Sequence, residues 1–144
     1  MAPTDSVKEL ARSLAKLPLF SELRDRQLRG LLRWAKERSY AAGATIVRQG
    51  EPGIGLYLII DGTVEVRRKS RKLATLRAGH VFGETALFGD APRTADVIAL
   101  EPTRCLVLSR WEFWGFVKDR PEILRSMLEE MVRRLAETNK ALPE

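Results

Sequence analysis

The middle of the chain is a series of short apolar segments separated by glycine, and this pattern restricts the fold more than any other feature of the sequence. Runs such as residues 56–60 and 63–66 have the length and composition of β-strands, and residues 96–100 and 104–108 add two more. The glycines between Tyr40 and the end of this region include Gly43, Gly50, Gly53, Gly55, Gly62 and Gly79. Repeated short strands with turns between them predict a β-barrel or jelly roll. The Asp61-Gly62 pair predicts a β-hairpin joining the first two runs.

The N-terminal segment has a helical pattern instead. Ser6 and Glu9 have the spacing of a capping box, and Leu10, Leu14 and Leu17 follow on one helical face. A second amphipathic helix is predicted to run to about Lys36, with an apolar face formed by Leu28, Leu31, Leu32 and Ala35. At 144 residues with 44% hydrophobic residues, the chain suits one core. We therefore predict a single domain over residues 1–144, mainly β with flanking α-helices.

Two helices are also predicted after the strands. Ser109 and Glu112 form a second capping-box pattern, and Asp119 followed by Pro121 marks the start of the last helix. That helix carries residues at successive spacings of 4, 3, 4, 3 and 4, namely Leu124, Leu128, Met131, Leu135, Thr138 and Leu142. This is the seam of a two-stranded coiled coil. It predicts a parallel homodimer through the C-terminal helix; the alternative is that the stripe packs only on its own barrel.

The charge and the cysteine content limit the possible partners and compartments. The net charge of +6 is spread along the chain, and its one dense run, residues 67–72, lies between two predicted strands. We interpret this run as a solvated hairpin tip, with a nucleic-acid or acidic-partner contact as the alternative. Cys105 is the only cysteine, so no internal disulfide can form, and we expect it at a buried strand position. Neither a signal peptide nor a membrane span is visible, which predicts a cytoplasmic protein without membrane contact.

The composition argues against an enzyme. His80 is the only histidine, so a jelly-roll metal site built from several histidines and carboxylates is not expected. A nucleophile activated by a histidine base would also depend on His80 alone. A haem or iron-sulfur sensor is not expected either, because a cluster needs several cysteines. We predict no catalytic residue, no metal site and no cofactor.

The segment from Val81 to Val97 is the strongest candidate for a ligand site. It places Glu84 and Arg93 nine residues apart, on either side of a turn rich in small residues. A guanidinium supplies planar donors to phosphate oxygens, and a carboxylate accepts hydrogen bonds from hydroxyls. Gly83 allows a ligand close to the backbone, and residues 84–87 are long enough for a helical turn with free N–H groups. The alternative is a surface ion pair between Glu84 and Arg93 beside a turn.

This segment resembles the phosphate-binding cassette of cyclic nucleotide-binding domains, here residues 82–95. The resemblance rests on Phe82-Gly83-Glu84, on Ala86-Leu87 and on Pro92-Arg93-Thr94-Ala95. It implies that Glu84 binds the ribose 2′-hydroxyl, that Arg93 binds the cyclic phosphate, and that backbone N–H groups from Gly83 through Thr85 to Ala86 complete the anion site. The implied ligand is cyclic AMP. A threonine at position 94 can favour guanine, so cyclic GMP remains open.

The resemblance extends over nearly the whole chain and is closest to the catabolite activator branch of transcription regulators. It implies N-terminal helices at 1–38, a β-roll at 39–109 and C-terminal helices at 110–142. In that branch the long last helix forms the dimer, and its polar residues, here Thr138 and Asn139, reach the adenine base. The implied function is a non-catalytic sensor, like the sensor half of a transcription regulator, in which ligand binding rearranges the helix dimer.

Three points stay open at this stage. The chain has no helix-turn-helix segment after its last helix, so we expect no DNA contact by this chain alone, although DNA is a possible partner of a longer regulator. A ligand-free dimerisation or docking module with the same fold is one alternative function. A stand-alone domain selective for cyclic GMP is another.

Overall fold

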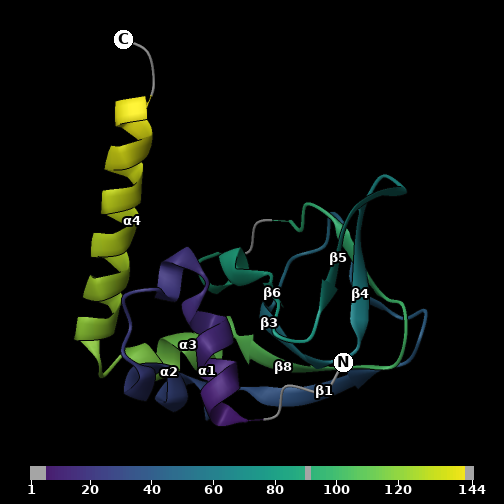
Figure 1. Ribbon diagram of the computed structural model, residues 1–144, viewed down its shortest axis with the longest axis horizontal. Coiled ribbons are helices and arrows are strands. Elements are labelled where there is room, and N and C mark those ends of the chain that lie inside the picture. The colour runs from purple at the N-terminus through teal and green to yellow at the C-terminus, as the bar shows by residue number, and fades with distance from the viewer. Residues whose placement is uncertain (1–5, 90–91, 142–144) are drawn as a thin grey trace.

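The computed structural model describes residues 6–89 and 92–141, and it shows a two-sheet β-roll with helices gathered at one side (Figure 1). The first sheet has the order β1 (Lys36–Tyr40), β8 (Thr103–Ser109), β3 (Gly55–Asp61), β6 (Val81–Phe82). The second has the order β2 (Thr45–Val47), β7 (Asp96–Ala99), β4 (Thr63–Arg68), β5 (Arg71–Arg77). All pairings are antiparallel. The predicted mainly β roll with flanking helices is confirmed.

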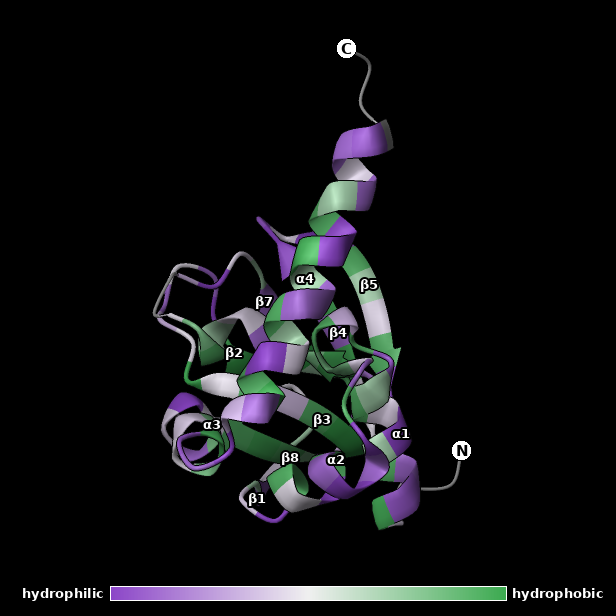
Figure 2. Ribbon diagram, turned by 90° about the vertical axis from the view of Figure 1, so that its left-hand side faces the viewer, coloured by the Kyte–Doolittle hydropathy of each residue, from purple (hydrophilic) through white to green (hydrophobic). Residues whose placement is uncertain are grey.

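Strand β3 contributes to two separate hydrophobic cores. Its residues Leu56, Leu58 and Ile60 join the cluster between the first sheet and the helices. Tyr57 and Ile59 point the other way and join the cluster between the two sheets. Because side chains alternate along a strand, a strand covered on both faces reads as a continuous apolar run. Figure 2 shows this strand and β8 as strongly hydrophobic ribbon.

The hairpin predicted at Asp61-Gly62 is wrong. The strands on either side, β3 and β4, belong to different sheets, so this turn carries the chain from one sheet to the other. Gly62 has a φ of 103°, and a Cβ there would lie 2.4 Å from Thr103 Oγ1. The turn that carries the chain between the sheets therefore needs a glycine just as a hairpin turn does. The Asp61-Gly62 pair alone cannot distinguish the two kinds of turn.

The true hairpin is the one formed by β4 and β5. Its tip has Lys69 and Ser70 at positive φ, and Arg68 pairs with Arg71 across it. Residues 68–72 are exposed, which confirms most of the solvated hairpin tip predicted for residues 67–72, whereas Arg67 is partly buried and pairs with Glu65.

The N-terminal helices differ in detail from the prediction. They are α1 (Val7–Ala15), the short 3-10 helix η1 (Pro18–Phe20) and α2 (Asp25–Leu32). Ser6 is the N-cap of α1 but makes no capping hydrogen bond through its side chain. Helix α2 ends at Leu32 rather than near Lys36, where β1 begins, because the chain must already be extended there to pair with Val107 of β8.

The C-terminal helices are α3 (Arg110–Val117) and the long α4 (Pro121–Ala141). The predicted capping box of α3 is confirmed: Ser109 N donates to Glu112 Oε1 at 2.9 Å, and Glu112 N donates to Ser109 Oγ at 3.1 Å. Helix α4 rises beside the other helices, and its C-terminal half projects away from the sheets (Figure 1). No helix within the described residues has the length and apolar character needed to cross a membrane.

Cys105 lies in β8 with 0% of its surface exposed, as predicted. Burial raises the pKa of its thiol from 9.0 to about 12. Because the folded state holds this proton more tightly than the unfolded state, the free energy of unfolding should fall as the pH rises above about 9. The thiol should also react with Ellman's reagent at pH 8 at least about 100-fold more slowly in the folded protein than in urea. Equal rates in both conditions would contradict the buried position.

Candidate functional site

The first part of the cassette is a sharp turn at the end of β6. Gly83 follows Phe82 with φ 80° and ψ 16°, the left-handed region that favours glycine. The 3-10 helix η2 (Glu84–Leu87) begins directly after it. Ala86 and Leu87 are buried and anchor this helix to the core, whereas Glu84 is partly exposed and Thr85 is exposed. The sequence therefore folds so that the two polar residues of η2 stay accessible.

The second part of the cassette brings Arg93 back beside Gly83. Arg93 N donates to Glu51 O at 2.9 Å, and Gly50 N donates to Arg93 O at 2.8 Å. An isolated bridge between Pro52 and Pro92 continues this pairing. The turn predicted from Gly89 to Pro92 includes residues 90 and 91, which lie outside the described part of the chain.

The guanidinium of Arg93 lies in a narrow space, its seat, where any side chain at Gly53 or Gly83 would collide with it. A Cβ on Gly83 would lie 2.5 Å from Arg93 Nη1, and one on Gly53 would lie 2.4 Å from Arg93 Nε. Arg93 Nη2 donates to Gly55 O at 2.8 Å. The guanidinium carbon also lies 5.9 Å from the centre of the Tyr57 ring, within cation–π range. The side chain is thus held from several sides beside the Gly83-Glu84 turn.

The electrostatics of this seat are those of a half-buried cation. Burial lowers the pKa of Arg93, and the nearby Tyr57 and Glu84 oppose that shift. The Nε atom is buried and has no hydrogen-bond partner among the described residues. Arg93 keeps its charge at neutral pH because an arginine pKa is far above it. The seat therefore presents a fixed positive charge with unused donors, which suits an anion.

The remaining cassette residues surround this pair. The ring of Phe82 stacks on Tyr57, with ring centres 4.9 Å apart and planes 4° from parallel. Thr94 is exposed, and its backbone O accepts a hydrogen bond from Arg68 Nε at 2.9 Å, which ties the β4–β5 hairpin to the cassette. The predicted residues 82–86, 93 and 94 thus lie in one region. The sequence did not predict Gly53, Gly55 or Tyr57 as site residues, although they contact Arg93; the glycine-rich stretch before β3 was their only signal.

An apolar groove of about 620 Å³ lies beside the cassette, between η1, η2 and α4. Glu84, Thr85 and Phe88 form its cassette wall. The facing wall comes from α4 and consists of Leu124, Met127, Leu128 and Met131. The first part of α4 therefore faces the same small helix that carries Glu84.

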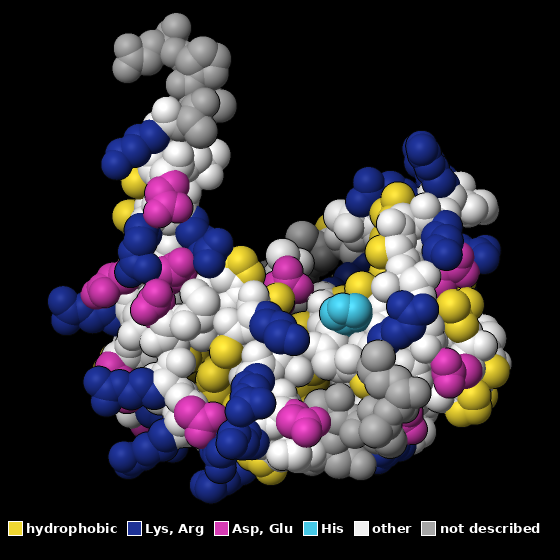
Figure 3. Space-filling view, in the orientation of Figure 1, with side chains coloured by type: hydrophobic (Ala, Val, Ile, Leu, Met, Phe, Trp, Pro, Cys, Tyr) yellow, Lys and Arg dark blue, Asp and Glu magenta, His cyan; other side chains and the backbone are white. Residues whose placement is uncertain are grey.

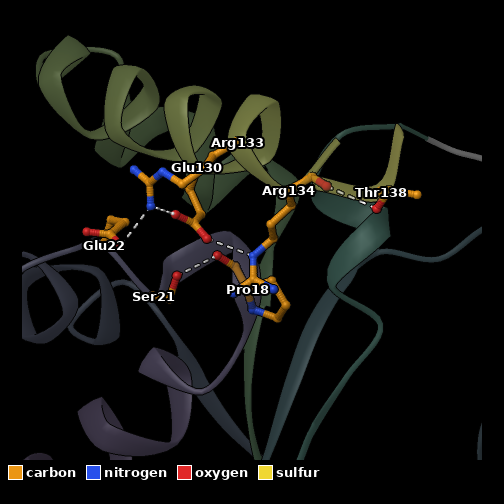
Figure 4. Close-up of polar contacts among 7 residues, drawn as sticks. All are labelled: Pro18, Ser21, Glu22, Glu130, Arg133, Arg134 and Thr138. Atoms are coloured by element: carbon orange, nitrogen blue, oxygen red, sulfur yellow. Dashed lines mark hydrogen bonds and ion pairs between the residues drawn. The ribbon is translucent and has the colours of Figure 1, made fainter. Parts of the chain in front are cut away.

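An ion-pair cluster fixes α4 against the turn after η1 (Figure 4). Glu130 is only 5% exposed and accepts hydrogen bonds from Arg133 and Arg134 of the same helix, the latter at 2.7 Å. Arg133 also donates to Glu22 at 3.2 Å. A buried carboxylate is stable only when it is paired in this way. Along the described part of α4, no ion pair is seen beyond this cluster.

Beyond the cluster, α4 leaves its own domain. Residues 132–140 are all exposed, and Thr138 and Asn139 lie in this projecting half. Thr138 Oγ1 donates to Arg134 O at 3.0 Å, a contact within the helix. Within one protomer the structure therefore does not bring these two predicted residues to Glu84 and Arg93.

The predicted seam of α4 is largely uncovered. Leu128 is 65% exposed and Leu135 61%, while Ile123 and Met127 of the same helix are buried against the domain. Leu124 and Met131 are partly buried, and Leu142 lies outside the described residues. Leu128 and Leu135 therefore do not pack on their own barrel, contrary to the alternative given for this stripe.

Comparison with known proteins gives consistent matches. A family model for the cyclic nucleotide-binding domain matches residues 37–120. The CRP-like cAMP-activated global transcriptional regulator of Mycobacterium tuberculosis is 29% identical over 134 residues, which cover 90% of this chain and 60% of that protein. The cyclic AMP receptor protein of Thermus thermophilus is 32% identical over 127 residues, 85% of this chain and 59% of that protein. This chain thus spans about three fifths of the length of both relatives.

A solved structure shares the whole architecture. The N-terminal domain of a transcriptional regulator from Streptomyces coelicolor A3(2) superimposes with a TM-score of 0.81 at 32% identity, covering 97% of this chain and 99% of that one. The likeness therefore includes the flanking helices as well as the β-roll. The matched family model covers more than half of the residues and includes the cassette, so the chain belongs to the cyclic nucleotide-binding domain family.

Proposed function

We propose that this domain binds a cyclic nucleotide at the cassette and prefers cyclic AMP. The observation that carries the proposal is the seat of Arg93, whose guanidinium is held against Gly83 and Gly53 beside Glu84. In this proposal Arg93 binds the cyclic phosphate through charge-assisted hydrogen bonds, and Glu84 accepts a hydrogen bond from the ribose 2′-hydroxyl. Backbone N–H groups at the start of η2 complete the anion site.

The relatives support cyclic AMP, whereas one residue of the cassette favours cyclic GMP. The M. tuberculosis relative is named as cAMP-activated and the Thermus relative as a cyclic AMP receptor. Thr94 is exposed next to Arg93, where a hydroxyl can donate to guanine. Cyclic AMP is therefore the first candidate, and cyclic GMP is the second because of Thr94.

We further propose that two chains pair in parallel through α4. The exposed Leu128 and Leu135 supply the apolar seam, and the projecting half of the helix has room for a partner. In such a dimer Thr138 and Asn139 of one chain would reach the base held by the cassette of the other. A ligand that touches both parts shifts the arrangement of the helices only by its different affinity for the two arrangements.

In this proposal the domain is a sensor without catalytic activity. Glu84, Thr85 and α4 line one groove, so a change at the cassette has a direct path to the dimer helix. Both curated relatives are longer than this chain, and the M. tuberculosis relative is a transcriptional regulator. We propose the same sensor role here, with any DNA contact made by residues outside this domain.

Calorimetric titration of the whole chain with cyclic AMP, cyclic GMP and 5′-AMP tests the proposal. We expect binding in the micromolar range or tighter, about −8 kcal/mol, for cyclic AMP and weaker binding for cyclic GMP. The open 5′-phosphate of 5′-AMP is the matched control and should bind much more weakly. Tighter binding of cyclic GMP would reverse the base preference. If no ligand produces heat or a thermal shift, the ligand-free dimerisation module becomes the better description.

A further inference from the structure

A second concave site lies between α2 and the start of α4. Helix α2 and the corner between α3 and α4 enclose a groove of about 720 Å³ that shares no lining residue with the cassette groove. We call it the arginine groove. Its charged and polar lining residues are Arg24, Asp25, Arg26, Gln27, Arg29, Arg33, Arg120 and Glu122.

The arginines of this groove are arranged in a row. Arg26, Arg29 and Arg33 occupy one face of α2 at positions i, i+3 and i+7. Gly30 lies on the same face and lets the Phe116 ring pack close beneath it, since a Cβ there would lie 3.1 Å from that ring. The buried ring of Phe116 therefore forms the floor, and the guanidinium groups form the rim.

Arg120 is fixed in place, and Arg29 is paired with Asp25 at the surface. Arg120 Nη1 donates to Phe116 O at 2.7 Å, and its guanidinium carbon lies 4.2 Å from the centre of the Phe116 ring. Arg29 Nε lies 2.6 Å from Asp25 Oδ2. Groups that are already ordered lose less entropy when a ligand binds. Arg120 thus presents its remaining donors from the wall opposite α2.

The other three arginines add charge that the protein does not neutralise. Within residues 6–89 and 92–141, no ion pair joins Arg24, Arg26 or Arg33 to a carboxylate. The two lining carboxylates, Asp25 and Glu122, leave the groove with a net charge of +3. Figure 3 shows Lys and Arg side chains gathered over this helical corner at the lower left. An anion entering the groove meets a strong positive potential.

The size and the chemistry of the groove indicate the ligand. Its volume is in the range of small-molecule sites, whereas a stable protein partner would need a surface of about 1,000 Å² or more. Arginine donates bidentately to phosphate oxygens, and all five cations here are arginines. Arg120 lies on one wall and the row of α2 on the other, so a ligand with several phosphates can engage both walls at once. We propose that the arginine groove binds a chain of two or more linked phosphates.

Calorimetry of the whole chain with inorganic triphosphate at about 0.15 M salt tests this proposal, because that ionic strength screens loose attraction to surface charge. The double variant Arg29→Gln/Arg33→Gln should bind triphosphate at least about tenfold more weakly. The matched control, Arg71→Gln/Lys72→Gln, removes the same charge from the exposed β4–β5 hairpin tip and should bind within about twofold of the parent. Circular dichroism checks that both variants are folded.

Two further measurements test whether triphosphate binds at the arginine groove or at the cassette, and which kind of polyphosphate the groove prefers. Triphosphate affinity should be unchanged in saturating cyclic AMP and in Arg93→Ala, so failure of cyclic nucleotide binding would leave this result standing. ATP and GTP that bind like triphosphate indicate recognition of the phosphate chain alone; tighter binding of either indicates a nucleoside polyphosphate. The proposal is overturned if triphosphate does not bind, if both double variants lose affinity equally, or if cyclic AMP displaces it.

Discussion

Replacing Arg93 by alanine should weaken binding of cyclic AMP by about 30- to 1,000-fold, which corresponds to roughly 2 to 4 kcal/mol. The guanidinium supplies charge-assisted hydrogen bonds to the cyclic phosphate, and its half-buried position strengthens them because less water competes. Arg93→Lys should lie between the parent and the alanine variant, since lysine keeps the charge but loses the planar fork. Calorimetric titration of the three proteins measures the differences.

A control is needed because Arg93 also fills space between Gly53 and Gly83. Arg71→Ala removes one arginine from the exposed hairpin tip and should leave the affinity for cyclic AMP unchanged. Thermal unfolding shows whether the Arg93 variants keep their fold, which we expect since the core clusters do not include this residue. If Arg93→Ala is folded and binds as tightly as the parent, the assignment of the phosphate site is wrong.

The double variant Leu128→Lys/Leu135→Lys should be monomeric, with a mass of 16.3 kDa by light scattering. Each leucine is more than half exposed in the single chain, so its burial must come from a partner. Burying one such side chain contributes about 1.5 kcal/mol or more, and a symmetric dimer loses both leucines twice, about 6 kcal/mol, so the dimer should weaken at least about 10,000-fold. The buried lysine charges add a further cost.

The control for the seam is Ala136→Lys, which adds one positive charge, half of that added by the double variant, one residue beyond Leu135 and outside the 4-3 spacing. It should leave the dimer intact. A parent chain that is already monomeric, or a double variant with an unchanged dimeric mass, would reject α4 as the interface. Measuring each protein with and without cyclic AMP also shows whether the ligand and the dimer are coupled, as the proposed contact of Thr138 and Asn139 requires.

Local patterns predicted the parts of this fold that depend on neighbouring residues. The capping box of Ser109 and Glu112 forms as expected because both partners lie within one turn. The hairpin tip at residues 68–72 is also as expected. The pattern failed at Asp61-Gly62, where the choice between a hairpin and a crossing depends on which distant strand each neighbour joins: β3 pairs with β8, and β4 with β7.

For the site, the sequence predicted the cassette residues and their resemblance to a family, but not how Arg93 is held. The seat formed by Gly53, Gly55 and Tyr57 lies far from Arg93 along the chain, and nothing in local spacing assigns those residues to it. The arginine groove is another such case. Its α2 row looks like an ordinary solvated helix face until Arg120 and Phe116 are brought opposite to it.

The sequence by itself determined the strand and helix types, the glycine at position 83 that lets a ligand approach the backbone, and the pair Glu84 and Arg93. It could do so because side-chain periodicity, glycine conformation and charge are properties of residues near one another in the chain. The tertiary structure alone decided the two-sheet topology, the seat of Arg93, and the attachment of α4 through Glu130 with its seam left exposed. These depend on contacts between residues far apart in sequence, whose energies exist only after the core has closed around them.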